Sequence, residues 1–527
     1  MRKRALAFAL LFQGCPSTTS SGPSRDASWS HPDVIVGATD RPALEVYITD
    51  ELRGQGLPCK LTVRGTNGTP DPAWGPSSQS GVWIDPASIA LGNGRWVLMA
   101  RGRATLPIGP SRDLLAPGSY RLTVTRGTEY AAIELGEVTV SATRGAVVTG
   151  TLRRSVETEG EIAGEFHVHS APSFDSDVPL DQRVLSLAAE GVEVFASTDH
   201  DTSADFSEAI AALDLQRHIH WVRGDEITAN GFGHFNVFPL PESVVPERDL
   251  PHLEPSVAQI VARAREVAPE AILQLNHPMW NTHAIGYWSI AGFDPSTGMA
   301  RMELVHQFDT VEVFNSHSLD EAPSVMASID AVIDAWMTTI DQGLSATATG
   351  NTDTHRLSKT PPGWPRTYLR VANDDPAAVT DAMITAALRA GDAMVTSGPF
   401  VRATINGQRQ GQLARDAGGR VTVSVEVQAP EFVPVDRVEV YANHVMVAAR
   451  ELTEPAHNGA RKQRWEIPLS LTRDAWVLVR TRADQPVPHD PGGDHALPLP
   501  SIAFTNPIFV DVDRDQRWTP PGPHTGP

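Results

Sequence analysis

Six apolar runs in the middle of the chain are each followed by histidine, aspartate or glutamate. The polar segments after these runs are His167–His169, Thr198–Asp201, Asp225–Glu226, Asn276–Pro278, Asn315–His317 and Asn351–His355. In a parallel β/α barrel the carboxyl ends of the strands converge on one face, where enzymes of this architecture place their sites. Imidazole and carboxylate groups gathered there suit a divalent ion such as Zn, Mn or Fe. The pattern therefore predicts a metal centre.

Two of these segments also have the spacing of a ligand pair. Residues two apart in an extended segment project the same way, so His167 and His169 can bind one ion from a single strand. Asp353 and His355 repeat this spacing on the last strand. Either pair alone is more often a surface or hydrogen-bonded pair than a ligand set. The metal centre is predicted because both pairs occur together with histidine, aspartate or glutamate at the other strand ends. Three further histidines are expected near this face as pocket residues rather than ligands: His283, His306 and His317.

The elements that must position these residues belong to a middle segment in which strand-like and helical runs alternate. This alternation, from about residue 162 to 396, indicates parallel β/α units. The segments before and after it, about 32–155 and from 398 onward, contain short alternating strands separated by turn signals such as Asn67-Gly68. Each of these two flanking segments is predicted to form a β-sandwich-like domain.

Composition excludes several classes of function. The net charge is −20 and the body of the chain has no block of Lys or Arg, so neither nucleic acid nor an anionic membrane surface is expected as a partner. The two cysteines, Cys15 and Cys59, are too few for a disulfide scaffold, an all-cysteine zinc site or an iron–sulfur cluster. We expect a small-molecule substrate. The sequence does not determine the oligomeric state.

The N-terminus has the pattern of an export signal. A basic start, Met1–Arg4, precedes the apolar run Ala5–Phe12 and then Cys15. A small residue directly before a lone cysteine resembles the bacterial lipoprotein signal, although Phe12 stands where that signal prefers Leu. This predicts a cell-envelope lipoprotein, periplasmic or on the outer surface, whose only membrane contact is a lipid on Cys15. Ordinary signal cleavage, or no export, remains the alternative.

The motifs in the middle segment resemble those of the PHP (polymerase and histidinol phosphatase) superfamily. The matching segments, in order, are Gly164–Ser170, Ser197–Asp201, Gly224–Glu226, Asn276–Pro278 and Asp353–His355. Three further segments resemble the CehA/McbA branch, which is named for a carbaryl hydrolase: Arg126–Tyr130, Gly233–Asn236 and Ala503–Pro507. With these, the resemblance covers nearly the whole mature chain.

The resemblance implies a multidomain protein with a central distorted (β/α)7 PHP barrel between N- and C-terminal β-sandwich-like domains. The expected divisions are a signal peptide at 1–15, a flexible tether at 16–31, an N-terminal β domain at 32–157, the barrel at 158–397, a C-terminal β domain at 398–515 and a disordered tail at 516–527.

The resemblance also implies two or three divalent ions. The first would be held by His167, His169, Glu226 and Asp353, the second by Glu226, His277 and His234, and the third by Asp175, His200 and His355. The sequence departs from the family pattern at Glu165, where the family often has Asp. Around Asp175 the segment Phe174–Asp177 replaces the usual Ser-Asp-Gly, which leaves Asp175 and Asp177 as alternatives for one ligand position.

The expected activity is hydrolysis by a metal-bridging hydroxide. We expect a phosphoesterase first, with Asp199 or Asp201 moving protons and Arg356 as the added cation that a phosphate ester favours. An aryl-ester, carbamate or amide hydrolase of the CehA type is the alternative among enzymes. A lipid-anchored binding or scaffold protein with a structural metal is the alternative from another class.

Overall fold

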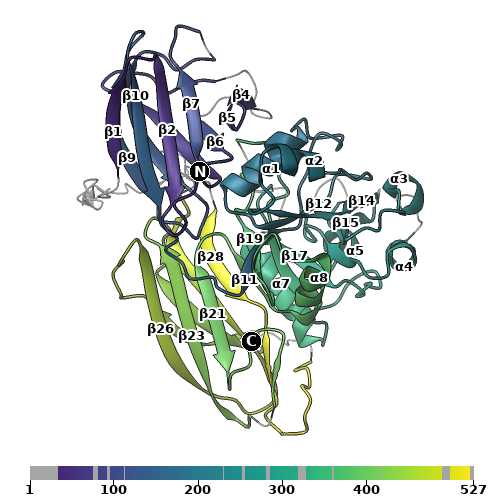
Figure 1. The fold of residues 1–527 in the computed structure, drawn as a ribbon. Coiled ribbons are helices and arrows are strands. Elements are labelled where there is room, and N and C mark those ends of the chain that lie inside the picture. The colour runs from purple at the N-terminus through teal and green to yellow at the C-terminus, as the bar shows by residue number, and fades with distance from the viewer. Residues whose placement is uncertain are drawn as a thin grey trace, which may run out of the picture.

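The chain has three parts in the computed structural model (Figure 1). The structure describes residues 34–74, 81–91, 95–111, 113–229, 231–251, 256–280, 285–317, 328–358, 361–415, 417–488 and 499–522. The predicted signal peptide and tether therefore lie outside the described residues, as does His283. An N-terminal β domain and a C-terminal β domain lie on one side of Figure 1, and the helix-containing central domain lies beside both.

The N-terminal domain consists of two sheets packed on a shared apolar core. Its strands are β1 (Ile35–Thr39), β2 (Ala43–Asp50), β3 (Cys59–Thr66), β4 (Gly81–Asp85), β5 (Ser88–Leu91), β6 (Trp96–Met99), β7 (Arg103–Pro107), β8 (Gly118–Thr125), β9 (Ile133–Val140) and β10 (Gly145–Leu152). One sheet has the order β1-β10-β2-β7 and the other β4-β5-β6-β3-β8-β9. Alternate residues such as Leu44 and Val46 of β2 and Leu61 of β3 point into this core, as expected for sheets buried on one face. Cys59 is buried there, and burial raises the pKa of its thiol to about 12.

The central domain mixes strands and helices. Its elements are β11 (Glu161–Glu165), α1 (Leu180–Ala189), β12 (Val194–Ser197), α2 (Ser207–Ala212), β13 (His220–Arg223), β14 (Asp225–Ala229), β15 (Gly233–Phe238), α3 (Pro246–Asp249), α4 (Val257–Val267), β16 (Ile272–Leu275), α5 (Tyr287–Ala291), β17 (Thr310–Asn315), α7 (Ile329–Asp341), β18 (Thr347–Asn351), β19 (Arg366–Arg370), α8 (Asp381–Ala390) and β20 (Ala393–Thr396). Several helices begin at a side-chain cap: Ser256, Ser328 and Thr380 each accept a hydrogen bond from a backbone N–H three residues on. None of the helices that the structure describes is long and apolar enough to cross a membrane.

The strand pairing of the central domain does not show an evident (β/α)7 barrel. Strands β11, β12 and β13 are parallel neighbours, and so are β16, β17 and β18, but the two sets belong to different sheets. Strand β15 pairs antiparallel with both β14 and β16. The short connection from β14 to β15 favours the first of these pairings. Two isolated parallel bridges, Val168 with Thr354 and His200 with Glu226, connect the two sheets.

The C-terminal β domain shares a sheet with the central domain. Its strands are β21 (Phe400–Ile405), β22 (Leu413–Ala414), β23 (Arg420–Pro430), β24 (Arg437–Ala442), β25 (Val445–Glu451), β26 (Ala460–Ser470), β27 (Ala475–Pro486), β28 (Pro500–Thr505) and β29 (Ile508–Val510). Strand β28 pairs with β20, so one sheet runs β13-β12-β11-β19-β20-β28-β27-β24-β25 through both domains. Strands β21, β23 and β26 form a separate sheet over the same core.

The segment predicted as a disordered tail is packed in its described part. The Trp518 ring packs against Phe509 at a tilt, the backbone N–H of Thr519 donates to Asp474, and the N–H of Gly522 donates to the carbonyl of Asp341 at the end of α7. Residues 523–527 lie outside the described residues.

Candidate metal centre

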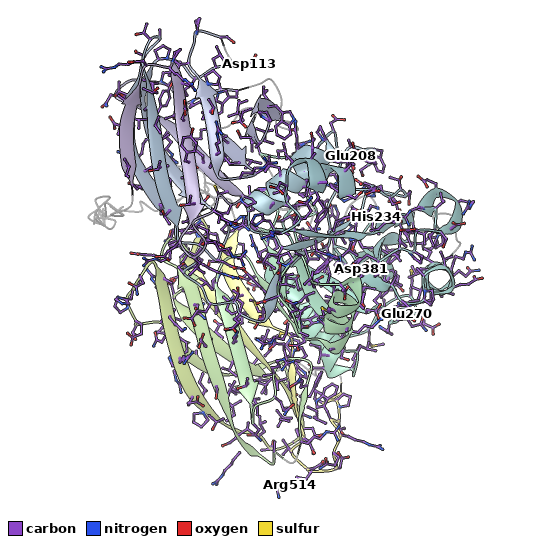
Figure 2. The ribbon with its side chains drawn as sticks, viewed as in Figure 1. Asp113, Glu208, His234, Glu270, Asp381 and Arg514 are labelled. Carbon is purple, nitrogen blue, oxygen red and sulfur yellow. The ribbon has the colours of Figure 1, made fainter. Side chains whose placement is uncertain are left out.

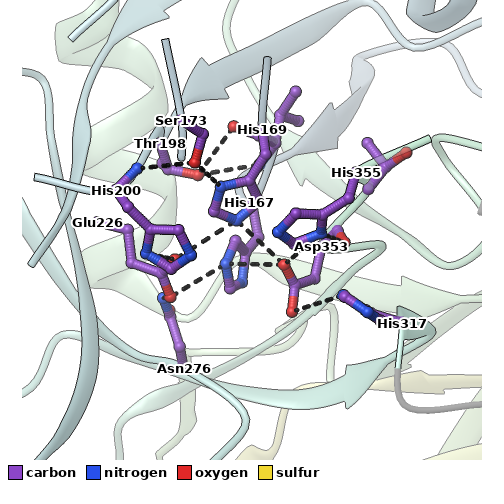
Figure 3. Close-up of polar contacts among 12 residues, drawn as sticks. His167, His169, Ser173, Thr198, His200, Glu226, Asn276, His317, Asp353 and His355 are labelled. Atoms are coloured by element: carbon purple, nitrogen blue, oxygen red, sulfur yellow. Dashed lines mark hydrogen bonds and ion pairs between the residues drawn. The ribbon is translucent and has the colours of Figure 1, made fainter. Parts of the chain in front are cut away.

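The nine residues expected as metal ligands lie together in the central domain. Figure 3 shows those it labels: His167, His169, His200, Glu226, Asp353 and His355. The nine residues come from different strand ends: His167 and His169 follow β11, His200 follows β12, His277 follows β16, and Asp353 and His355 follow β18. Glu226 lies in β14 and His234 in β15, while Asp175 lies in the loop between β11 and α1. Several overlapping groups of potential ligand atoms are found among these residues together with His317, within the described part of the chain.

Glu226 is the centre of the cluster. Its Oε1 lies 3.2 Å from His167 Nε2, 3.2 Å from His234 Nδ1 and 3.6 Å from His277 Nε2. Its Oε2 lies 3.0 Å from His200 Nδ1 and 3.4 Å from His169 Nε2. A fully buried carboxylate surrounded by five imidazoles can bridge two cations, because each of its oxygens faces a different set of nitrogens.

Asp353 forms a second meeting point. Its Oδ1 lies 3.3 Å from His167 Nε2 and 3.1 Å from His169 Nε2, and 3.5 Å from His355 Nδ1. Its backbone has a φ of +53°, a left-handed conformation that non-glycine residues adopt at a cost of order 1–3 kcal/mol. The chain thus holds this carboxylate in place against a local backbone preference.

Asp175, rather than Asp177, belongs to the cluster. Asp175 Oδ2 lies 3.1 Å from His200 Nε2 and 3.0 Å from His355 Nε2. Asp177 is exposed two residues further along the loop. With His169 nearby, Asp175, His200 and His355 form one of the groups able to hold an ion.

The hydrogen bonds of four histidines leave Nε2 available as a ligand. The Nδ1 atoms of these histidines bond respectively to a carboxylate, two hydroxyls and a backbone carbonyl: His167 to Glu312 at 3.0 Å, His169 to Ser173 at 3.1 Å, His200 to Thr228 at 2.6 Å and His355 to the carbonyl of Asp353 at 2.8 Å. An Nδ1 that donates its proton leaves Nε2 with a free lone pair, the arrangement typical of metal-binding histidines.

Several of the buried ligand atoms have no hydrogen-bond partner among the described residues. They are Nε2 of His167, Nε2 of His169, Nδ1 of His277 and Oε2 of Glu226. Buried polar atoms are almost always hydrogen-bonded, so such a concentration of unpaired nitrogen and oxygen atoms needs an explanation. Mixed imidazole and carboxylate donors at strand ends fit divalent ions, and the residues present therefore fit the implied metal group.

The electrostatics of the cluster favour ionised carboxylates. Burial raises the pKa of Glu226, but the imidazoles of His167, His200 and His234 outweigh it and lower that pKa well below its ordinary value. Burial also lowers the pKa of His169 to about 3, with His355 and His200 adding to the effect, so this imidazole is neutral. Neutral imidazole and ionised carboxylate are the protonation states that bind a metal.

The three residues expected to act on protons or phosphate are placed differently. Both carboxylate oxygens of Asp199 accept hydrogen bonds from Ser170, so Asp199 holds the turn after His169 rather than facing the cluster. Asp201 Oδ1 accepts from the N–H of Thr228. Arg356 is half-buried and forms no ion pair with the residues that the structure describes.

Glu312 is a functional candidate that the sequence reasoning missed. It lies in β17 and is buried, and its four hydrogen-bond partners are the Nδ1 of His167, the backbone N–H of His277, and the side-chain amides of Asn315 and Asn351. Its signal in the sequence was a lone carboxylate inside the apolar run of that strand, Thr310–Phe314.

Of the further histidines near the face, His317 lies at the cluster and His306 does not. His317 Nδ1 is 3.7 Å from Asp353 Oδ2, and its side chain is 24% exposed. His306 lines a different cavity beside Asp309 and Arg389. Phe174 is exposed next to the site and stacks on the His200 ring, with ring centroids 4.6 Å apart.

Comparison with known proteins adds little to this geometry. No protein-family model matches the chain, and no curated protein matches it. Among solved structures, a chain from Bifidobacterium adolescentis described as a "putative metal-dependent phosphoesterase" is similar at 16% sequence identity and a TM-score of 0.25, covering 38% of this chain and 90% of that one. A TM-score this low carries no argument about function, so the interpretation rests on the site itself.

Proposed function

We propose that this chain is a divalent-metal-dependent hydrolase of the PHP type, and that its substrates are phosphate esters. The observation that carries the proposal is the convergence of nine histidine and carboxylate side chains, four of which have a buried nitrogen or oxygen atom without a hydrogen-bond partner among the described residues. A structural metal needs four ligands, whereas this cluster offers enough for two or three ions. Clusters of that size are typical of hydrolytic sites with neighbouring metal ions.

The two sheets of the central domain are proposed to be the halves of one distorted barrel. The bridges between Val168 and Thr354 and between His200 and Glu226 join the sheets directly beside the ligands. Regular strand pairing ends at His167, His169, His200 and Asp353, which turn toward the centre of the site. A residue that turns toward this centre no longer takes part in the hydrogen bonds between neighbouring strands. This would explain why the ring of paired strands in the proposed barrel is interrupted on the side where the candidate metal ligands lie.

In this proposal three groups of residues, whose side chains lie close to one another, hold the ions: His167, His169, Glu226 and Asp353; Glu226, His234 and His277; and Asp175, His200 and His355. When bound, a divalent ion supplies a water of lowered pKa and polarises the bond under attack. The protein's part is to orient the ligands. Glu312, Ser173 and Thr228 do so by keeping the protons of His167, His169 and His200 on Nδ1.

Proton transfer to the leaving group is assigned to the partly exposed edge of the site. His317, near Asp353, is partly exposed to solvent, so its ring nitrogen can hold a proton for the leaving oxygen. Asp201 is retained as the base candidate because it lies beside the His200–Glu226 bridge. Asp199 is proposed only to position the turn after His169, through the hydrogen bonds that it accepts from Ser170.

An aryl ester or carbamate is the second candidate substrate, and Phe174 favours it. This exposed ring beside His200 offers a stacking surface for an aromatic leaving group. Arg356, by contrast, would favour phosphate. The non-catalytic scaffold remains the third candidate.

The deciding experiment is a comparison of two substrates on the purified protein loaded with Mn or Zn. Preference for an aryl phosphate over the matching aryl carbamate supports the phosphoesterase, and the reverse preference supports the carbamate hydrolase. Turnover of neither, combined with unfolding of the protein on chelation, would support a structural metal and refute the proposal. Export as a lipoprotein through Cys15 is proposed alongside, from the N-terminal pattern alone.

A further inference from the structure

A cavity lies between the N-terminal β domain and the central domain, away from the metal centre. Its volume is about 240 Å³. The N-terminal domain contributes Asp50 at the end of β2, Arg53 in the loop after it, and the segment after β8, with Arg126 and Tyr130. The central domain contributes Glu193, the segment Arg217–His218 between α2 and β13, and the segment Asp374–Pro376 before α8.

Arg126 lines this cavity and has a buried donor without an acceptor. The residue is 5% exposed, and its Nη1 donates to the carbonyls of Pro58 and Ala188, which ties the two domains together. Its Nε is buried and has no hydrogen-bond partner among the described residues. A buried guanidinium N–H without an acceptor costs free energy, so an acceptor in the cavity would be stabilising.

Two further arginines reach the cavity from opposite domains without a carboxylate partner. Arg53 and Arg217 are exposed, and neither forms an ion pair with any residue in the described part of the chain. The pKa of His218 reflects the positive electrostatic potential of the arginines around it. Burial lowers the pKa of His218, and Arg126, Arg53 and Arg217 lower it further, to about 4.

The carboxylates that line the cavity are each engaged with a backbone N–H. Asp50 accepts from Leu52, Asp374 from Gly160, Asp375 from Ala377, and Glu193 from Ala163. Arg154, the fourth arginine of the lining, already pairs with Glu129 at 2.5 Å. The Nε of Arg126 and the guanidinium groups of Arg53 and Arg217 therefore have no carboxylate partner among the described residues.

We propose that this cavity binds a small tetrahedral oxyanion, phosphate or sulfate in size, between Arg126, Arg53 and Arg217. Guanidinium groups form paired, charge-assisted hydrogen bonds with such anions. One anion held by Arg126 and Arg53 on one side and by Arg217 on the other joins the N-terminal β domain to the central domain. The site is independent of the metal centre and of the proposed hydrolysis.

The test is a calorimetric titration of the full-length protein with sulfate, at constant ionic strength with chloride as the exchanged ion. Sulfate is expected to bind the unaltered protein and the control Arg144→Gln, which removes an exposed charge from the same domain, with equal affinity. The double variant Arg53→Gln/Arg217→Gln should bind at least about tenfold more weakly, since two of the three guanidinium groups that hold the anion are lost. Both replaced side chains are exposed, so the fold should be retained.

Proton uptake provides a second, local readout. An anion beside His218 offsets the three guanidinium groups, so binding near pH 5 should take up protons, and this uptake should disappear in His218→Gln. Phosphate should behave as sulfate does at this site. Equal sulfate affinity in the double variant and the control, or no sulfate binding at all, would overturn the proposal. Hydrolysis by the metal centre should be the same in every variant.

Discussion

Glu312→Gln is expected to weaken metal binding although Glu312 is not itself a proposed ligand. The two carboxylate oxygens of Glu312 face four donors. Oε1 lies 3.0 Å from His167 Nδ1 and 3.1 Å from Asn351 Nδ2, while Oε2 lies 2.8 Å from the N–H of His277 and 2.9 Å from Asn315 Nδ2. Glutamine has the same shape but replaces one oxygen with an NH2 group. Two of the four donors would then face another donor.

The size of the effect follows from these contacts. The site is 1% exposed, so water cannot replace the lost acceptor. A buried donor left unsatisfied costs about 1–3 kcal/mol, which for two donors lowers the free energy of unfolding by roughly 2–6 kcal/mol. The effect on the metal acts through His167 and His277, whose orientation Glu312 sets. Loss of such a supporting partner typically lowers metal affinity about 10–100-fold, or roughly 1.4–2.7 kcal/mol.

The assay is competition for Zn between the metal-free protein and a chromophoric chelator of known affinity. Glu208→Gln is the matched control, because Glu208 is an exposed residue of α2 at the surface of the central domain (Figure 2). The control should bind Zn as the unaltered protein does. Affinity of Glu312→Gln within twofold of the control would refute the reasoning that Glu312 orients the ligands. Far-UV circular dichroism at the assay temperature checks that the variant is folded.

Three other predictions follow from single contacts. Asp353→Ala should lower the bound metal measured by atomic emission and abolish hydrolysis while the flanking β domains stay folded; unchanged metal content would contradict the ligand assignment. His444 pairs with Asp334 and Asp341 of α7, and these carboxylates overcome the effect of burial to raise its pKa to about 9. Its stabilisation is therefore complete below about pH 6.5 and is lost as the pH rises through 9. Since Asp334 is 55% exposed, we expect about 1–2 kcal/mol, seen in urea unfolding as a gap between the protein and His444→Asn that closes by pH 10. Cys15→Ser should move the protein from the membrane fraction to the soluble exported fraction, and an unchanged distribution would argue against lipidation.

The sequence indicated which polar residues lie close together, but not which backbone conformations bring them together. His167 and His169 were expected together because alternate residues of an extended segment share a face, and the structure brings them together around Glu226. Asp353 and His355 also meet, but with Asp353 in a left-handed conformation that no strand rule predicts. A ligand pair can thus be anticipated from spacing even where the local conformation differs from the assumed one.

Long-range pairing was beyond the reach of sequence patterns. The short strands after residue 398 were readable, but the pairing of β28 with β20 joins residues about a hundred positions apart, and no periodicity encodes it. That pairing makes the C-terminal domain an extension of the central sheet rather than a separate sandwich. Glu312 was missed for a related reason. A single carboxylate in an apolar strand is informative only once its partners on three other segments are known.

Protons and metal ions are alternative occupants of the same buried cluster. Glu226, Asp353 and Glu312 are buried together, and their mutual repulsion requires positive charge nearby. Without metal, that charge comes from the imidazoles. Burial lowers the pKa of His167 and of His200, but the surrounding carboxylates outweigh it, raising the first well above its ordinary value and the second to about 9. The Nε2 of His167 faces Glu226 and Asp353, while His200 faces Glu226 with Nδ1 and Asp175 with Nε2. A binding metal ion must displace those protons, so the cluster that stabilises the metal-free fold by protonation is also one whose metal affinity increases with pH.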